Sequence, residues 1–170
     1  MQSLKGKVAV VVGATRGAGR GIACMLGEAG ATVYCTGRST RADQAGRPAQ
    51  PRGTSAAGDR SAGSPFELEG RPETIEETAE MVEAYGGTGI PVRVDHTVEE
   101  QVEALFGRVR SEQGRLDILV NDIWGGDALT EWGTPFWQLS IAKGRLMLDR
   151  AVHAHIIASR YGAPLMVEAG

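Results

Sequence analysis

The sequence predicts an α/β fold in which helices cover both faces of a parallel sheet. Short apolar runs of strand length alternate along the 170 residues with longer stretches whose apolar residues recur at helical spacing. The first run, Val8–Val12, is apolar throughout, which is typical of a strand buried on both faces, as in parallel sheets. A chain of this length can bury the core that such a sheet needs.

The N-terminal part of the chain predicts a strand, a turn, a helix and a second strand. The first strand is Lys7–Val12, and the second is Ala31–Thr36, which is rich in β-branched and aromatic residues. Between them the glycine-dense turn Gly13–Gly19 opens a helix that ends near Gly30. The residues expected to face the core from this helix are Ile22, Met25, Leu26 and Ala29. A right-handed crossover makes the two strands parallel.

Residues 41–72 have a different composition. Four of the seven prolines and five glycines fall there, and the only large apolar side chains are Phe66 and Leu68. The segment shows no periodicity and has too little apolar surface to form a core of its own. It therefore predicts a mobile Pro/Gly-rich insertion in one domain, 1–170, rather than a second domain.

The alternation of elements resumes at residue 73. A helix is predicted over Glu73–Tyr85, and its end is marked by two glycines. Thr97 and Glu100 have the spacing of a capping box, so they should open another helix that ends near Gly114. The two further strands expected here are Ile90–Val94 and Leu116–Val120.

An aromatic-rich loop leads to a last helix, which Pro164 should disturb. The apolar stripe expected to face the core from this helix comprises Leu148, Ala151, Val152, His155, Ile156 and Ser159. We expect His155 to be a partly buried histidine with a hydrogen-bond partner. Together the elements predict a Rossmann-like, doubly wound parallel sheet of about four strands.

Composition excludes several classes of function. A net charge of -3 gives no broad electrostatic reason to expect nucleic acid or an anionic membrane as partner. The longest aliphatic run is far too short to span a membrane, and residues 1–7 lack the plan of a signal peptide, so we expect a cytoplasmic protein. Cys24 and Cys35 fall on a helix and a strand and should be core residues, and no metal site is expected.

The glycine-dense turn predicts a binding site for phosphate. Where a glycine loop opens a helix, unpaired N–H groups and the positive end of the helix dipole converge without side chains in the way. The glycines follow the pattern G-x-x-x-G-x-G rather than the commoner G-x-G-x-x-G. The residues expected to contact the phosphates are Gly13, Thr15, Arg16, Gly17, Ala18 and Gly19.

The segment Val12–Gly19 resembles the motif T-G-x-x-x-G-x-G of the short-chain dehydrogenase/reductase family, with valine in place of threonine. The resemblance implies hydride transfer between a nicotinamide dinucleotide and an unknown small carbonyl or alcohol substrate. Two segments, 121–126 and 161–167, look like the divergent branch of the family related to dehydrogenase/reductase member 1. An extended-type sugar-nucleotide epimerase is disfavoured by the glycine spacing.

The tip of the second strand indicates which dinucleotide is bound. NAD-binding folds usually place an acid there to accept a hydrogen bond from the ribose 2′-OH. Here the tip has Arg38, Ser39 and Arg41 and no acid, and Arg16 adds another cation that could reach a 2′-phosphate. We therefore expect NADP(H) in preference to NAD(H), although the arginines could be solvated loop charges.

Two more residues extend the resemblance. Asp95, followed by His96, stands where the family has an Asp that approaches the adenine amine; capping of a turn or helix is the alternative. Asn121 ends the fourth strand where the family carries Asn-Asn-Ala-Gly, but the next three residues differ. We expect three residues on the cofactor side of the sheet: Asp95, His96 and Asn121.

Four aromatic residues fall within the loop after the fourth strand: Trp124, Trp132, Phe136 and Trp137. They could wall a pocket near the nicotinamide, because ligands of such sheets lie beyond the carboxyl ends of the strands. They could equally form a small cluster that packs the loop onto the last helix.

The residues that carry out the family's reaction are not found. The family uses an upstream Ser, a Tyr and a Lys four residues after the Tyr. Here the residues four positions before the three lysines, Lys5, Lys7 and Lys143, are Met1, Ser3 and Leu139, and none of them is a tyrosine. The sheet is then incomplete, because the chain ends before a fifth strand. We expect the NADP-binding portion of an oxidoreductase, without catalytic residues and inactive alone. A non-catalytic dinucleotide-binding or interaction module is the alternative, and a homo-oligomer stays open.

Overall fold

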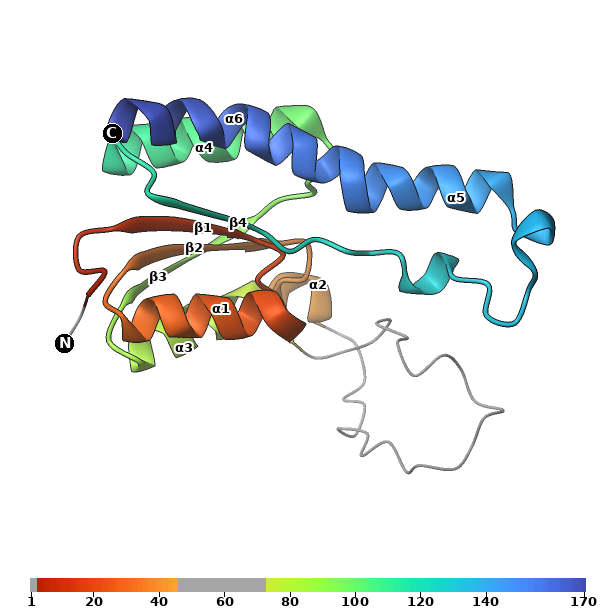
Figure 1. Ribbon diagram of the computed structural model, residues 1–170. Helices are drawn as coiled ribbons and strands as arrows, with labels where there is room; N and C mark the ends of the chain where they lie inside the picture. The colour runs from red at the N-terminus through yellow and green to blue at the C-terminus, as the bar shows by residue number, and fades with distance from the viewer. Residues whose placement is uncertain (1–2, 46–72) are drawn as a thin grey trace.

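A computed structural model describes residues 3–45 and 73–170 of the chain. In this part, four parallel strands form one sheet in the order β3-β2-β1-β4 (Figure 1). The strands are β1 (Val8–Val12), β2 (Thr32–Gly37), β3 (Thr88–Arg93) and β4 (Ile118–Asn121). The predicted doubly wound parallel sheet is confirmed, and each strand lies within about two residues of its expected bounds.

Helices cover both faces of the sheet (Figure 1). On one face lie α1 (Gly17–Glu28) and α3 (Ile75–Ala84), and on the other lie α4 (Glu99–Gln113) and α6 (Ala154–Ala169). The helix α5 (Ile141–Leu148) runs into α6 through a π-helical segment, Asp149–His153, so that the two form one long helix. This arrangement carries the start of α6 past the carboxyl ends of the strands.

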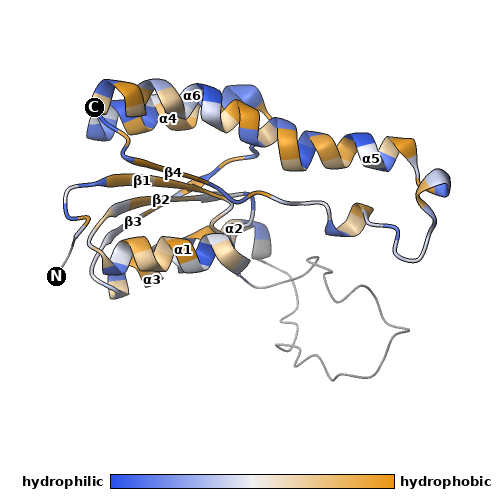
Figure 2. Cartoon of the chain, in the orientation of Figure 1, coloured by the Kyte–Doolittle hydropathy of each residue, from blue (hydrophilic) through white to orange (hydrophobic). Residues whose placement is uncertain are grey.

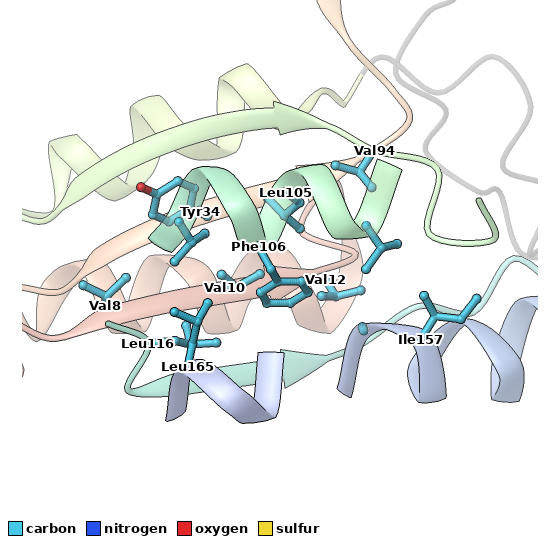
Figure 3. Packing of buried hydrophobic residues seen from close by; sticks show 13 residues of the cluster. Val8, Val10, Val12, Tyr34, Val94, Leu105, Phe106, Leu116, Ile157 and Leu165 are labelled. Carbon is cyan, nitrogen blue, oxygen red and sulfur yellow. The ribbon is translucent and has the colours of Figure 1, made fainter. Parts of the chain in front are cut away.

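The core has two parts because successive side chains of a strand point to opposite faces. Val8, Val10 and Val12 pack with residues of α4 and α6, whereas Ala9 and Val11 face α1 and α3. Figure 2 shows the apolar strands between helices in which hydrophobic and hydrophilic residues are mixed along the length. Figure 3 shows the first cluster, in which Leu105 and Phe106 of α4 and Ile157 and Leu165 of α6 meet β1.

The expected core face of α1 is only partly correct, because Leu26 is the one large apolar residue of that face that packs against the core. Ile22 and Met25 are 37% and 55% exposed, and the buried side instead includes Ala23 and Gly27. A Cβ added to Gly27 would lie 2.9 Å from the carbonyl oxygen of Val82, so α1 packs on α3 at a distance that only small residues allow. Cys24 and Cys35 are buried core residues, as predicted.

The expected core face of the last helix is wrong. Leu148, Val152 and Ile156 are exposed, whereas the residues that pack on the sheet side are Ala154, Ile157, Ala158, Gly162 and Leu165. Small residues again allow the close approach, since a Cβ on Gly162 would lie 2.9 Å from Leu119. Pro164 lies inside α6, and the helix continues through it.

Two boundaries differ from the prediction. Thr97 does not form a capping box with Glu100; α4 begins at Glu99 after Val98, with no side-chain cap, because the Thr97 hydroxyl donates to Asp95 instead. Residues 41–44 form the short helix α2 (Arg41–Gln44), capped by Thr40, so the insertion does not begin as a loop. The rest of the predicted insertion, 46–72, lies outside the described residues.

Candidate functional site

A pocket of about 430 Å³ lies at the carboxyl edge of the sheet. The glycine loop, the tips of β2 and β3, the loop after β4 and the π-helical segment before α6 each contribute to its wall. The lining residues are Gly13, Thr15, Arg16, Gly17, Ala18, Gly37, Arg38, Ser39, Val94, Asp95, His96, Thr97, Asp122, Ile123, Trp124, Gly125, Asp127 and Arg150. Nine of the eleven predicted site residues therefore line one pocket; Gly19 and Asn121 do not.

The glycine loop has a shape that suits a phosphate ligand. Gly17 has φ +61° and no atom within 4 Å of the place where a Cβ would be, so the loop leaves open space there. The helix α1 begins at this residue, and Arg16 before it makes no side-chain cap. The first N–H groups of α1 thus lack a capping side chain beside the pocket, as an anion site at a helix N-terminus requires.

The other two glycines of the motif, Gly13 and Gly19, allow neighbouring backbone segments to pack closely. A Cβ on Gly13 would lie 2.6 Å from the carbonyl oxygen of Asp122, and one on Gly19 would collide with the carbonyl oxygen of Gly13. Gly19 therefore does not line the pocket but lets α1 approach the end of β1. The residues fit a dinucleotide pyrophosphate, because the loop is open where the ligand would approach and close-packed behind.

Two arginines and a hydroxyl gather at the β2 side of the pocket. Arg16 Nη2 lies 3.4 Å from Ser39 Oγ, and its Nε lies 3.9 Å from a carboxylate oxygen of Glu73. Arg38 Nη1 lies 3.8 Å from Asp95 Oδ2, and the Arg38 side chain is 58% exposed. Among the residues that the structure describes, no acid lines the pocket at the tip of β2.

Arg41 does not belong to this group. Its guanidinium donates to both carboxylate oxygens of Glu80 on α3, at 2.6 and 2.5 Å, and it is not among the pocket-lining residues. Arg41 is therefore paired away from the pocket, and the predicted 2′-phosphate site consists of Arg16, Arg38 and Ser39. Position along the chain placed Arg38 and Arg41 together, but α2 turns the second arginine towards α3.

Asp95 caps a turn. Its Oδ1 accepts hydrogen bonds from the backbone N–H of Thr97 at 3.0 Å and from the Thr97 hydroxyl at 2.7 Å. Burial raises the pKa of Asp95, but the Thr97 hydrogen bonds and the charge of Arg38 outweigh it, so the pKa is below its ordinary value. The turn-capping alternative is confirmed; the contact with an adenine amine stays a prediction.

His96 is a buried wall of the pocket, with only 5% of its surface exposed. Its Nε2 lies 2.8 Å from Thr36 Oγ1. Burial lowers the pKa of His96 to about 4, and nearby His155 lowers it as well, whereas Asp95 acts in the opposite direction. The ring is therefore neutral at neutral pH.

Asn121 stands behind the pocket. It ends β4, and its Nδ2 donates to Ser159 Oγ of α6 at 3.0 Å, which ties the strand to the helix. The next two residues, Asp122 and Ile123, do line the pocket. Asp122 was not selected as a site residue from the sequence, because the family that the chain resembles has asparagine at this position.

On the β4 side of the pocket, the sequence indicated an aromatic wall but not Asp127 or Arg150. Trp124 Nε1 donates to Asp127 Oδ1 at 2.9 Å, and Arg150 Nη1 donates to the carbonyl oxygen of Gly125 at 2.9 Å. Of the four aromatic residues, Trp124 lines the pocket, whereas the other three are exposed and do not line it: Trp132, Phe136 and Trp137. The pocket-wall interpretation is correct for Trp124 alone.

The expected hydrogen bond of His155 is confirmed, because its Nε2 lies 2.9 Å from the carbonyl oxygen of Ile123. In residues 3–45 and 73–170, no group of three or more His, Cys, Asp or Glu side chains is arranged to hold a metal ion. Over the same ranges, no helix is long and apolar enough to cross a membrane.

Comparison with known proteins gives close sequence relatives. A family model described as enoyl-(acyl carrier protein) reductase matches residues 66–170. Dehydrogenase/reductase SDR family member 1 of Mus musculus is 35% identical over 170 residues, which cover 98% of this chain and 44% of that protein. The chain thus spans about half the length of the curated relatives it matches.

Solved structures share the fold. A putative dehydrogenase from Xanthomonas campestris matches with a TM-score of 0.72 and 24% identity, over 98% of this chain and 50% of that one. The structure of 7α-hydroxysteroid dehydrogenase with NADH and 7-oxo glycochenodeoxycholic acid matches with a TM-score of 0.69 and 25% identity, over 99% and 51%.

Proposed function

Because the chain belongs to the short-chain dehydrogenase/reductase family, we propose that its pocket binds a nicotinamide dinucleotide, with NADP(H) preferred over NAD(H). The glycine loop and the N-terminus of α1 hold the pyrophosphate. Arg16, Arg38 and Ser39 surround the 2′-phosphate at the tip of β2.

The positive charge at the tip of β2 is the observation that supports a preference for NADP(H) over NAD(H). A 2′-phosphate needs cations and hydroxyl donors, and a carboxylate at this place would repel it. Arg16, Arg38 and Ser39 line the pocket, and Arg38 is exposed enough to turn from Asp95 towards a ligand. The 7α-hydroxysteroid dehydrogenase relative holds NADH, so family membership alone does not select between the two dinucleotides.

The whole protein, we propose, transfers hydride between the nicotinamide and a carbonyl or alcohol substrate. Within the 170 residues no Tyr is followed by a Lys at the fourth position. The proposal assigns to this chain the binding of the cofactor, as residues 1–170 of an NADP-binding domain, and not the proton transfer at the substrate oxygen.

The test compares two arginine variants by calorimetric titration with NADPH and NADH. Arg38→Gln should weaken NADPH binding about tenfold and change NADH binding less than twofold, since one charge-assisted contact to phosphate is lost. Arg41→Gln is the matched control, because Arg41 follows the same strand but is paired with Glu80; it should change neither. An equal loss for both dinucleotides in Arg38→Gln would refute the preference.

A second candidate is a dinucleotide-binding module without chemistry, which the missing Tyr-x-x-x-Lys pattern favours. For this chain it makes the same predictions, in binding and in turnover, and it differs only for the whole protein, which would not transfer hydride. Adding a panel of aldehydes and ketones to the purified chain with NADPH should give no oxidation above a blank. Oxidation by the chain would exclude this candidate and show that another residue supplies the proton.

A further inference from the structure

Arg150 is a cation in the pocket that has no anionic partner among residues 3–45 and 73–170. It is half-buried and lines the β4 side, across β1 from the tip of β2. Its one hydrogen bond within the described ranges goes from Nη1 to the carbonyl oxygen of Gly125. Arg16 and Arg38, by contrast, lie within 4 Å of the carboxylates of Glu73 and Asp95.

The neighbouring acid does not neutralise Arg150. Asp127 lines the same side of the pocket, but its carboxylate accepts from the indole N–H of Trp124 and forms no ion pair with Arg150 in the described structure. A guanidinium carries five N–H donors in a planar fork, of which the Gly125 carbonyl takes one. Donors therefore remain for a ligand in the pocket.

The helix holds Arg150 in place through an irregular turn. Arg150 belongs to the π-helical segment Asp149–His153, and His155 follows five positions later. In a regular α-helix residues five apart differ by about 140° around the axis, and a wider π turn reduces this angle. Both side chains consequently reach the loop after β4, Arg150 at Gly125 and His155 at Ile123.

The loop after β4 lies beside the Arg150 side chain. Gly125 has φ +74°, and a Cβ there would lie 3.5 Å from Arg150 Cδ. The Gly125 backbone thus lies beside the Arg150 side chain and also accepts its hydrogen bond, so part of the side chain's conformational freedom is lost before a ligand binds. A partly desolvated, oriented guanidinium without a counter-ion is suited to an oxyanion.

We infer that Arg150 is an oxyanion-binding residue of this pocket, which donates to a phosphate or carboxylate oxygen of the bound ligand. The inference rests on the proposed function in that the pocket takes a dinucleotide. The oxyanion has two chemical sources: the pyrophosphate of the dinucleotide, or a carboxylate on the carbonyl or alcohol substrate.

Calorimetric titration of the full chain with three probes separates these sources. NADPH carries the pyrophosphate, adenosine 2′,5′-bisphosphate carries the 2′-phosphate without the nicotinamide half, and benzoate, added with NADP⁺, carries one carboxylate. The variants are Arg150→Gln and Arg150→Lys. Arg145→Gln is the control, because Arg145 is an exposed arginine of α5, five residues earlier, and its side chain has no hydrogen-bond or ion-pair partner in the described part of the chain.

Arg150→Gln should weaken either NADPH or benzoate about tenfold or more, and Arg150→Lys should restore part of the loss. A loss for NADPH assigns the pyrophosphate, and a loss for benzoate alone assigns the carboxylate. Adenosine 2′,5′-bisphosphate lacks the nicotinamide-side phosphate, which in the proposed placement is the one nearer the β4 side of the pocket where Arg150 lies, so it should bind both variants and the unaltered chain alike.

The inference is overturned if neither NADPH nor benzoate distinguishes Arg150→Gln from Arg145→Gln. It is also overturned if all probes weaken equally, because Arg150 would then only hold the loop in place. Failure of adenosine 2′,5′-bisphosphate to bind the unaltered chain would instead count against the proposed 2′-phosphate site. In that case, the affinities of the Arg150 variants for benzoate still test the inference about Arg150.

Discussion

The imidazole of His96 and the hydroxyl of Thr36 form a hydrogen bond whose direction is fixed by a third group. Thr36 Oγ1 lies 3.0 Å from the carbonyl oxygen of Val11 and 2.8 Å from His96 Nε2. A carbonyl can only accept, so the single hydroxyl proton goes to Val11, and Nε2 must donate to Thr36. The proton of the neutral ring is therefore on Nε2. Nδ1 is an acceptor, buried and without a hydrogen-bond partner in the described residues.

This arrangement predicts that stability depends on pH through His96. Burial lowers the pKa of His96 to about 4 in the folded chain, against an ordinary value of 6.5. Between these values the unfolded chain binds more protons, so the free energy of unfolding falls as pH drops from about 6.5 to about 4. The full effect is on the order of 3 kcal/mol. Urea unfolding at pH 7 and pH 4.5 measures it.

His96→Gln is the comparison, since an amide can still donate to Thr36 but does not titrate. The variant should show a weaker pH dependence than the unaltered chain over this interval. His155→Gln controls for the nearby histidine, and Asp95, which also faces His96, is unchanged in all three proteins. Identical pH slopes for His96→Gln and the unaltered chain would contradict the assignment.

Two glycines of α1 should respond to alanine in opposite directions. A Cβ on Gly27 would lie 2.9 Å from both the backbone oxygen and Cγ1 of Val82, whereas one on Gly21 meets nothing within 4 Å. Gly27→Ala should therefore lower the free energy of unfolding by about 1 to 3 kcal/mol. Gly21→Ala should raise it by about 0.5 to 1 kcal/mol, because alanine favours the helix. Urea denaturation of the two variants checks the difference, and equal effects would show that α1 does not pack closely on α3.

Asp122 should limit the affinity for the dinucleotide. Asp122 is a pocket-lining residue, and its Oδ2 lies 2.9 Å from where a Cβ of Gly19 would be, near the first turn of α1. A negative charge there repels pyrophosphate, so Asp122→Asn should tighten NADPH binding about two- to fivefold at low salt. Asp149→Asn, an exposed position that does not line the pocket, changes the net charge equally and should leave binding unchanged. Weaker binding in Asp122→Asn would show that the carboxylate accepts a hydrogen bond from the ligand.

The sheet and the glycine loop could be predicted because their signals are local. Val8–Val12 is apolar on both faces, and Gly13 and Gly17 have positive φ angles that glycine adopts without strain. The helix faces could not be predicted from large apolar residues, because α1 and α6 pack through small ones such as Gly27 and Gly162. Large side chains such as Met25 and Ile156 consequently lie outside.

The candidate site was predictable where it follows the ends of strands, and less so elsewhere. Arg38, Ser39 and Asp95 directly follow β2 and β3, and the topology brings those ends together. Arg150 lies on a helix far along the chain, and a π-helical turn that regular helical periodicity does not describe places it in the pocket. The pairing of Arg41 with Glu80 could not be predicted, because it depends on how α3 packs.

The central claim is that this pocket binds a dinucleotide through its 2′-phosphate. Side-by-side calorimetric titration of the unaltered chain with NADPH and NADH at the same ionic strength tests it most directly. The cations Arg16 and Arg38 at the tip of β2 predict a dissociation constant for NADPH at least tenfold lower than that for NADH. Equal affinities, or tighter binding of NADH, would contradict the claim.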